Sequence, residues 1–257
     1  MISSLIRVLR RKAAHKRLMD ELRSAADRVF PERKVLAGPF EGLEYPDWRG
    51  HGSAVFAKLL GTYEAELYSF IERVLTSGPK TVIDIGCAEG FYAIGCAQRL
   101  PGVRVVAADL SGAARELCAR MAQLNKVGER VDIVGRVTRQ DLLGLGGKPA
   151  GWLIADCEGG EEELFDPEVF SQYAAWFILI ELHEFLVPGI EDRLITEVRR
   201  THDVQVIDSV DDYRRERHWP RPCLAGLPIE IRHEFYREGR PGLMRWICAS
   251  PRTAVVA

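Results

Sequence analysis

The segment 81–97 constrains the fold of this chain more than any other. It opens with a short β-branched run at residues 82–85, which predicts a buried parallel strand. Gly86 and Gly90 follow, and the apolar, alanine-rich stretch after them predicts a helix. A strand, a glycine turn and a helix place free backbone N–H groups and a positive helix end at one edge of a sheet. Nucleotide-like ligands bind at that edge in open α/β sheets.

The spacing of the glycines indicates which nucleotide is expected. A dinucleotide-binding turn requires G-x-G-x-x-G, but the third and sixth positions counted from Gly86 are Ala88 and Phe91. The observed pattern is an acid, Asp84, followed by Gly86 and Gly90, and it resembles motif I of the class I S-adenosylmethionine (SAM)-dependent methyltransferases. In that family the glycines admit the methionine part of the ligand and the acid helps to order its ammonium group. A glycine turn with a purely structural use is the alternative.

This resemblance assigns a set of cofactor-binding residues around the turn. They are Asp84, Gly86, Cys87, Ala88, Glu89 and Gly90.

The overall composition excludes several classes of protein. The chain has 257 residues, 47% hydrophobic and 28% charged, which is typical of a globular protein with one sizeable core. The net charge of −2 argues against general nucleic-acid binding. Six scattered cysteines without a C-x-x-C pair argue against a zinc or disulfide framework and favour reduced thiols in the cytoplasm. The sequence has no apolar run long enough to span a membrane.

Residues 1–30 form a basic extension. Eight Lys or Arg and three acids give this stretch a local charge of +5. Apolar residues recur at helical spacing and Pro31 ends the pattern, so we expect an amphipathic helix. The helix either lies peripherally on the anionic inner face of a membrane or packs on the core or on a second subunit, and packing is favoured.

Residues 31–78 form a second segment before the predicted sheet. The pattern GPF-x-G-x-x-Y, followed by LLGTYE, resembles the N-terminal part of uncharacterised methyltransferases from bacterial polysaccharide and natural-product pathways. That resemblance implies a segment that caps the cofactor site. A solvated linker with buried aromatic residues is the alternative.

A second β-branched run, residues 103–108, ends at Asp109. A carboxylate at this strand end suits a vicinal diol, because it can accept hydrogen bonds from both hydroxyl groups. The methyltransferase resemblance implies that Asp109 holds the cofactor ribose, and we place the adjacent Leu110 in the same site. A third strand is predicted at 131–137, and Thr138 at its end is assigned to the border of the adenine pocket.

A further apolar strand ends in the sequence Asp-x-Glu-Gly-Gly-Glu, which begins at Asp156. This sequence resembles the Asp-x-Glu-Gly-Ala-Glu signature of the FkbM-type methyltransferases, with Gly160 in place of the usual alanine. Asp156 is expected at the carboxyl edge of the sheet, where it faces the glycine turn. Glu158 is expected to contact the substrate. The acids at 161–163 also suit a helix N-terminus through charge–dipole attraction, and Glu162 and Glu163 are assigned to that role.

The strand predicted at 175–182 ends near Glu181 and His183, which share one face because strand side chains alternate. Two roles are open for Asp156, Glu181 and His183. They hold and activate the substrate with His183 as the general base, or they ligate a divalent metal ion. General-base chemistry is slightly favoured.

Residues 209–242 form a long insertion between the last two predicted strands, 204–208 and 243–249. Long loops in compact domains are usually functional or disordered. We expect the insertion to bind an anionic or sugar-like substrate through Tyr213, Arg214 and Arg217. The alternative is that the insertion is a solvated surface loop.

Together these features predict a doubly wound, seven-stranded α/β methyltransferase domain at 79–257, whose last two strands form an antiparallel pair. The expected function is SAM-dependent transfer of a methyl group, preferably to oxygen, on a small molecule or saccharide in a bacterial biosynthetic pathway. A non-catalytic scaffold and, with less support, a nicotinamide-dependent oxidoreductase are the alternatives.

Overall fold

Seven strands form one mixed sheet in the order β3-β2-β1-β4-β5-β7-β6. The structure is a computed structural model that describes residues 2–52, 54–146 and 150–252, with side chains from residue 16 onward. The parallel strands are β1 (Thr81–Ile85), β2 (Arg104–Ala108), β3 (Val131–Val134), β4 (Trp152–Ala155) and β5 (Phe177–Leu182). The antiparallel pair consists of β6 (His202–Asp208) and β7 (Arg245–Pro251). The predicted seven-stranded sheet with an antiparallel closing pair is therefore confirmed.

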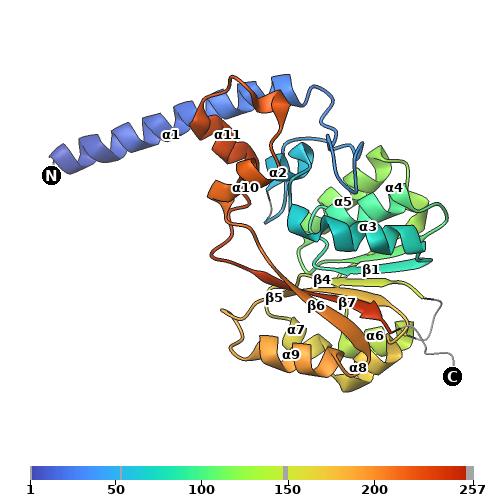
Figure 1. Cartoon of the computed structure of the whole chain (residues 1–257). Helices are drawn as coiled ribbons and strands as arrows, with labels where there is room; N and C mark the ends of the chain where they lie inside the picture. The colour runs from blue at the N-terminus through green and yellow to red at the C-terminus, as the bar shows by residue number, and fades with distance from the viewer. Residues whose placement is uncertain (1, 53, 147–149, 253–257) are drawn as a thin grey trace.

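Helices cover both faces of this sheet (Figure 1). One face carries α3 (Tyr68–Ser77), α4 (Phe91–Arg99) and α5 (Gly112–Leu124). The other face carries α6 (Arg139–Leu145), α7 (Glu161–Leu164), α8 (Pro167–Gln172) and α9 (Ile190–Val198). Two hydrophobic clusters, one on each side, fill the space between the layers.

The central strands are apolar because neither face meets water. Four of the five residues of β1 are buried, and all four residues of β4 are buried. Parallel strands between two helical layers are expected to appear in the sequence as continuous apolar runs. This pattern allowed the positions of these strands to be predicted. The third strand is shorter than predicted, since pairing with β2 ends at Val134.

Helix α1 (Ile2–Val29) extends along one end of the molecule, and its N-terminal half projects away from the body (Figure 1). Leu22, Ala25 and Ala26 are buried, so the C-terminal half packs on the core. For the C-terminal half of α1, this burial agrees with the expected packing on the core of the same chain. The side chains of residues 2–15 lie outside the described part of the structure. Among the described residues, no helix is long and apolar enough to cross a membrane.

The segment between α1 and the sheet folds onto the edge of the helical layer. It contains α2 (Val55–Leu60) and the 3-10 turn η1 (Ala65–Leu67), which leads into α3. Tyr45 and Phe40 are almost fully buried, so these two aromatic residues belong to the core.

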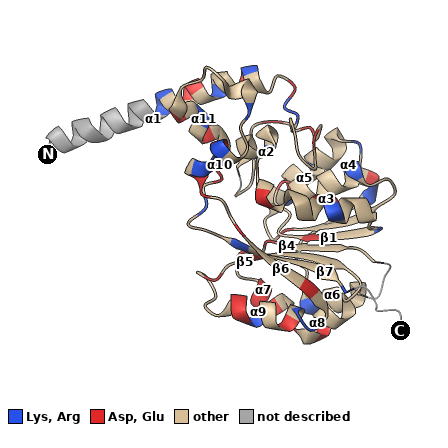
Figure 2. Ribbon diagram, viewed as in Figure 1, with Lys and Arg blue, Asp and Glu red and all other residues tan. Residues whose placement is uncertain are grey.

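The insertion at 209–242 is ordered as α10 (Asp212–His218), η3 (Pro222–Leu224) and α11 (Ile229–Tyr236). Figure 2 shows the concentration of basic residues on α10. Arg215 of this helix is fully buried and pairs with Glu66 and Glu238. Arg221 donates hydrogen bonds to the carbonyl oxygens of Leu60 and Gly61, at 3.0 and 2.6 Å. These contacts secure the insertion to the C-terminal end of α2.

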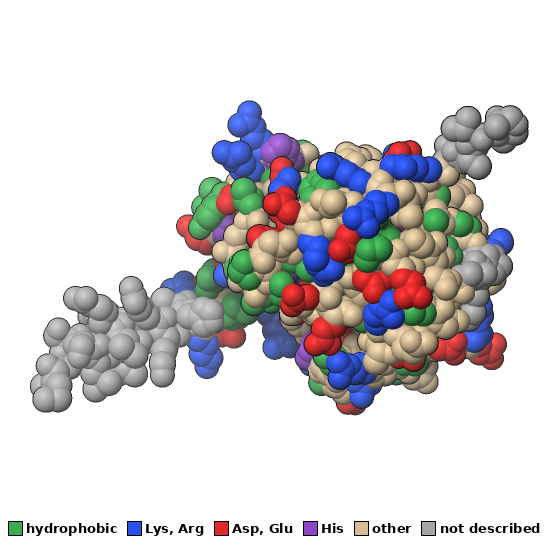
Figure 3. Space-filling model, turned by 90° about the horizontal axis from the view of Figure 1, so that it is seen from below, with side chains coloured by type: hydrophobic (Ala, Val, Ile, Leu, Met, Phe, Trp, Pro, Cys, Tyr) green, Lys and Arg blue, Asp and Glu red, His purple; other side chains and the backbone are tan. Residues whose placement is uncertain are grey.

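Acidic and basic side chains are interspersed on the face seen from below in Figure 3. This mixture fits the net charge of −2 for the whole chain.

We predict that Arg215→Met destabilises the protein by about 3–5 kcal/mol, because the nearly buried Glu66 loses its cationic partner and Glu238 loses one of two. The side chains of Glu66 and Glu238 are 6% and 1% exposed, so water cannot replace the guanidinium. Urea unfolding followed by circular dichroism measures the difference.

Arg217→Met on the same helix is the matched control, because Arg217 is exposed. Its free energy of unfolding should stay within about 0.5 kcal/mol of the wild type. Equal losses from the two substitutions would show that the buried ion pairs do not secure the insertion.

Candidate functional site

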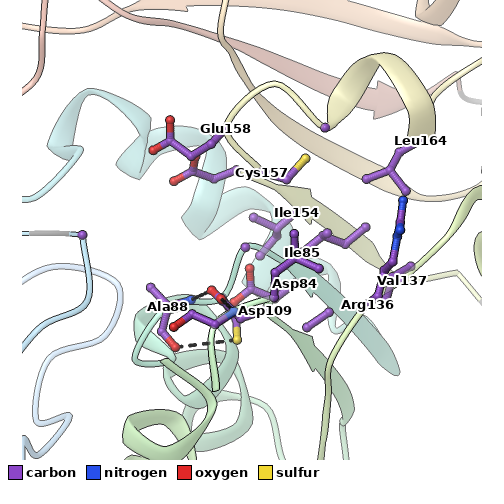
Figure 4. A pocket seen from close by; sticks show the side chains of 18 of the residues that line it. Asp84, Ile85, Ala88, Asp109, Arg136, Val137, Ile154, Cys157, Glu158 and Leu164 are labelled. Atoms are coloured by element: carbon purple, nitrogen blue, oxygen red, sulfur yellow. Dashed lines mark hydrogen bonds between the residues drawn. The ribbon is translucent and has the colours of Figure 1, made fainter. Parts of the chain in front are cut away.

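A cavity of about 830 Å³ lies at the carboxyl ends of β1, β2 and β4. Figure 4 shows Ala88 and Asp109 together at one wall, and Cys157 and Glu158 at the opposite wall. Asp84 lies between them at the base of the cavity. The cavity therefore joins the two sequence motifs that were predicted to meet at this edge.

The glycine turn depends on the absence of side chains. Gly86 has φ +85°, and a Cβ atom placed there would lie 1.6 Å from the carbonyl oxygen of Asp156. Gly90 has φ +96°, and its Cβ would meet Ile94 and Cys118 at 2.8 and 2.9 Å. Both positions thus combine a left-handed backbone with close approach to a neighbouring element, which only glycine permits at low cost.

The backbone N–H groups of the turn are largely used within the protein. Gly86 and Cys87 donate to the carbonyl oxygen of Ala108, at 2.8 and 3.0 Å. Ala88, a non-glycine residue at φ +49°, donates to Asp109 at 2.9 Å. The prediction of free N–H groups is therefore wrong at these three positions, because the adjacent strand supplies their acceptors.

Asp109 is held in place through both carboxylate oxygens. Oδ2 accepts the N–H of Ala88, and Oδ1 accepts the N–H of Ser111 at 2.8 Å. Each carboxylate oxygen has a second lone pair, so the group can still accept hydrogen bonds from a ligand in the cavity. Leu110 beside it is 77% exposed at the cavity rim.

Thr138 also lines the cavity, at the N-terminus of α6. Its hydroxyl group forms a capping box with Asp141, so that hydroxyl is already engaged by the helix. The guanidinium group of Arg139, its neighbour, pairs with Asp166 and Glu168.

Two predicted cofactor residues are buried acids. Asp84 accepts the N–H of Ala93 at 3.0 Å, and burial raises its pKa to about 7. Glu89 pairs with Lys58 at 2.6 Å; burial opposes the charged form, but the lysine charge holds the pKa of Glu89 below its usual value. A cationic ligand group would therefore stabilise the ionised form of Asp84, whereas Glu89 already has the cation of Lys58 beside it.

The opposite wall is formed by the loop that follows β4. Asp156 lines the cavity with 41% of its side chain exposed, and Glu158 does so with 76% exposed. Glu158 and Gly159 have φ of +51° and +93°, so the chain turns sharply before α7 begins. This turn brings Glu161 back beneath the loop, where its Oε1 accepts the N–H of Cys157 at 3.3 Å.

Glu161 and His183 form a buried pair. Glu161 is fully buried, His183 is 2% exposed, and Glu161 Oε1 lies 2.8 Å from His183 Nδ1. Burial opposes both charges, yet the contact between the two groups lowers the pKa of Glu161 and raises the pKa of His183. The contact also fixes the ring, so that Nε2 faces Asp156 and Glu158 at 3.5 Å each.

Glu181 lies behind the cavity wall that the loop after β4 forms. It is 4% exposed and paired with Arg240. Burial and the neighbouring Asp156 raise the pKa of Glu181 well above its usual value. Burial likewise raises the pKa of Asp156, to about 6.

The three residues predicted to contact substrate through the insertion lie elsewhere. Tyr213, Arg214 and Arg217 are exposed on α10 and are not among the described residues that line the cavity. Tyr213 stacks on His233, with ring centroids 4.5 Å apart. The insertion approaches the site through Arg240 instead.

The sequence did not identify several residues that shape the site. Lys58 and Tyr63 line the cavity from the N-terminal segment, and Glu161 and Arg240 orient the groups beneath its wall. Two local signals were present: the LLGTYE pattern that contains Tyr63, in the segment expected to cap the cofactor site, and the position of Glu161 in the Asp-x-Glu-Gly-Gly-Glu sequence.

We predict that Gly86→Ala destabilises the protein by at least about 2 kcal/mol, from the left-handed backbone and from overpacking. The new methyl group would overlap the Asp156 carbonyl, and relieving that overlap separates β1 from β4. Thermal unfolding measures the loss.

Gly128→Ala is the matched control, because a Cβ atom there meets nothing within 4 Å. It should change stability by less than about 1 kcal/mol. Similar stability of the two variants would refute the close approach of the two turns.

Comparisons with known proteins give limited matches. No family model matches the chain. The release factor glutamine methyltransferase of Chlorobaculum tepidum is 38% identical over 76 residues, which cover 28% of this chain and 26% of that protein. The chain thus matches about a quarter of the length of this curated relative.

Solved structures with a similar arrangement have low identity. The O-methyltransferase TomG from Streptomyces achromogenes, in complex with SAM, is 13% identical with a TM-score of 0.45, covering 89% of each chain. The O-methyltransferase from Bacillus cereus is 13% identical with a TM-score of 0.45, covering 71% of this chain and 79% of that chain. Spermidine synthase from Thermotoga maritima is 15% identical with a TM-score of 0.47, covering 69% and 56%.

Proposed function

We propose that the protein is a SAM-dependent methyltransferase that transfers a methyl group to a hydroxyl oxygen of a small molecule or saccharide. The observation that most directly supports this proposal is the position of Asp109 beside the glycine turn, at the wall of the 830 Å³ cavity. A carboxylate there can accept hydrogen bonds from both hydroxyls of a ribose. The partial match to a methyltransferase and the FkbM-like Asp-x-Glu-Gly-Gly-Glu sequence agree with this proposal.

The cofactor would extend along the carboxyl ends of β1 and β2. Its ribose would bind Asp109, its adenine would lie between Leu110 and Thr138, and its methionine part would pass the glycine turn towards Asp84. The raised pKa of Asp84 favours this placement, because an ammonium group nearby would stabilise the carboxylate that burial disfavours.

The acceptor would bind at the opposite wall, where Asp156 and Glu158 face the cavity. Bound SAM would supply the methyl group: the acceptor oxygen would form the new carbon–oxygen bond in line as the carbon–sulfur bond broke, with its electron pair left on sulfur. The hydroxyl proton passes to the carboxylate–imidazole group formed by Asp156, Glu158 and His183. Positioning of the two reactants supplies much of the rate enhancement.

We expect the protein to bind S-adenosylhomocysteine (SAH) with micromolar affinity in calorimetric titration, and NADH not at all. Asp109→Ala should weaken SAH binding by about tenfold or more, because a charged hydrogen-bond acceptor is lost. NADH binding in place of SAH would favour an oxidoreductase.

Asp132→Ala is the matched control. Asp132 is an exposed acid on β3 that pairs with Arg104, outside the described cavity lining. It should leave the affinity for SAH unchanged. Binding of neither SAH nor NADH by the folded wild type would favour a non-catalytic scaffold.

We also predict that His183→Ala lowers turnover by about 10²–10⁴-fold while SAH affinity changes little. The ring lies behind the acceptor wall and does not line the part of the cavity assigned to the cofactor. SAH formation with a panel of saccharides and phenols measures turnover.

His218→Ala, at an exposed position on α10, is the control for loss of an imidazole. Full turnover in the His183 variant would exclude a role for this wall in activating the acceptor.

A further inference from the structure

We propose that Asp156, Glu158 and His183 form a binding site for one divalent transition-metal ion, such as Mn²⁺, at the acceptor wall of the cavity. One ligand atom from each residue lies within 4.8 Å of the other two. His183 Nε2 is 3.5 Å from Asp156 Oδ1 and 3.5 Å from Glu158 Oε2. Ligands at right angles around an ion at about 2.1 Å lie about 3 Å apart, so small side-chain shifts complete the site.

The orientation of His183 is independent support for a cation at this point. Its side chain is 3% exposed, and Nδ1 is engaged by Glu161. Nε2 is directed between the two carboxylates, and at 3.5 Å both oxygens are farther than an ordinary hydrogen bond. Nε2 therefore points towards the same two carboxylate oxygens that would share the ion.

Glu161 supplies the support that a metal-binding histidine requires. Metal-ligating histidines commonly bond through their other ring nitrogen to a carboxylate, which fixes the tautomer and strengthens the ligand. Here Glu161 Oε1 lies 2.8 Å from Nδ1, and Glu161 itself is fully buried. Nε2 is consequently the ring atom presented to an ion.

The local charge also favours a cation. Asp156, Glu158 and Glu161 surround a single imidazole. Arg240 reaches the same region, but it is already paired with Glu64, Glu181 and Glu238. A divalent ion would offset the excess of negative charge.

The ligand set indicates the class of ion. Two carboxylates and one imidazole mix oxygen and nitrogen donors, which suits Mn²⁺, Fe²⁺ or Zn²⁺ better than Mg²⁺ or Ca²⁺. The ligands predicted from the sequence were Asp156, Glu181 and His183. In the proposed site Glu158 takes the place of Glu181, because the Glu181 carboxylate is bound by Arg240.

The ion's remaining coordination positions would face the cavity, because Asp156 and Glu158 line it. An acceptor hydroxyl bound there would lose its proton to water at a lower pH. With the ion bound, the ion would replace the carboxylate–imidazole group as the activating group, because Nε2 would then be a ligand. This use of the ion rests on the proposed methyl transfer, whereas the binding site itself does not.

The test is a titration of the EDTA-treated protein with Mn²⁺, followed by electron paramagnetic resonance and calorimetry. We expect one Mn²⁺ per chain, with an imidazole nitrogen coupling in the pulsed spectrum. Glu158→Gln should weaken binding by at least about tenfold, and Glu161→Gln by about 10–100-fold. Glu158 is largely exposed, so its variant should fold normally.

Glu162→Gln is the matched control, because Glu162 is an exposed acid that lines the same cavity outside the cluster. Its affinity for Mn²⁺ should equal that of the wild type. Failure of the wild type to bind Mn²⁺ or Zn²⁺, or equal affinity of the Glu158 variant and the wild type, would overturn the site.

SAH binding in EDTA, measured on the same preparations, separates this proposal from the proposed function. Mn²⁺ binding without SAH binding would support the metal site and contradict methyl transfer. SAH binding without Mn²⁺ binding would support methyl transfer and contradict the metal site.

Discussion

The pairing of buried carboxylates with Arg240 connects three distant parts of the chain. Arg240 comes from the insertion between β6 and β7, Glu64 from the segment before the sheet, and Glu181 from β5. Each carboxylate would cost several kcal/mol to bury alone, so none of these parts can occupy its position without the others. Asp156 depends on the same guanidinium, whose charge favours the ionised form of that carboxyl group. The insertion thereby acts on the candidate site without lining it.

The sheet could be predicted from the sequence because its strands satisfy a local rule. Each parallel strand is buried on both faces and therefore reads as a short apolar run, as β4 does. The polar residues that end these runs, Asp109 and Asp156, were placed correctly at one edge of the sheet. The end of β3 could not be predicted, because it is set by its pairing with Ala108 on β2 and not by the apolar Val137.

The interior of the candidate site could not be predicted, because its contacts join residues far apart in the chain. The bond from Arg240 to Glu64 spans 176 positions, and no pattern in the sequence relates the two. Glu161 has the same local signature as Glu162 and Glu163, an acid at a helix start, yet it alone is buried against His183. Burial distinguishes these acids, and burial follows from the loop geometry.

The contacts that secure the insertion also affect the order in which the chain can fold. Arg221 and Arg215 bind backbone carbonyls at the end of α2, across 161 and 153 positions. During synthesis, β1 to β4 can emerge and pair while these carbonyls still lack their partners. The contacts of the α2 end with Arg215 and Arg221 can therefore form only after the ribosome has released the insertion.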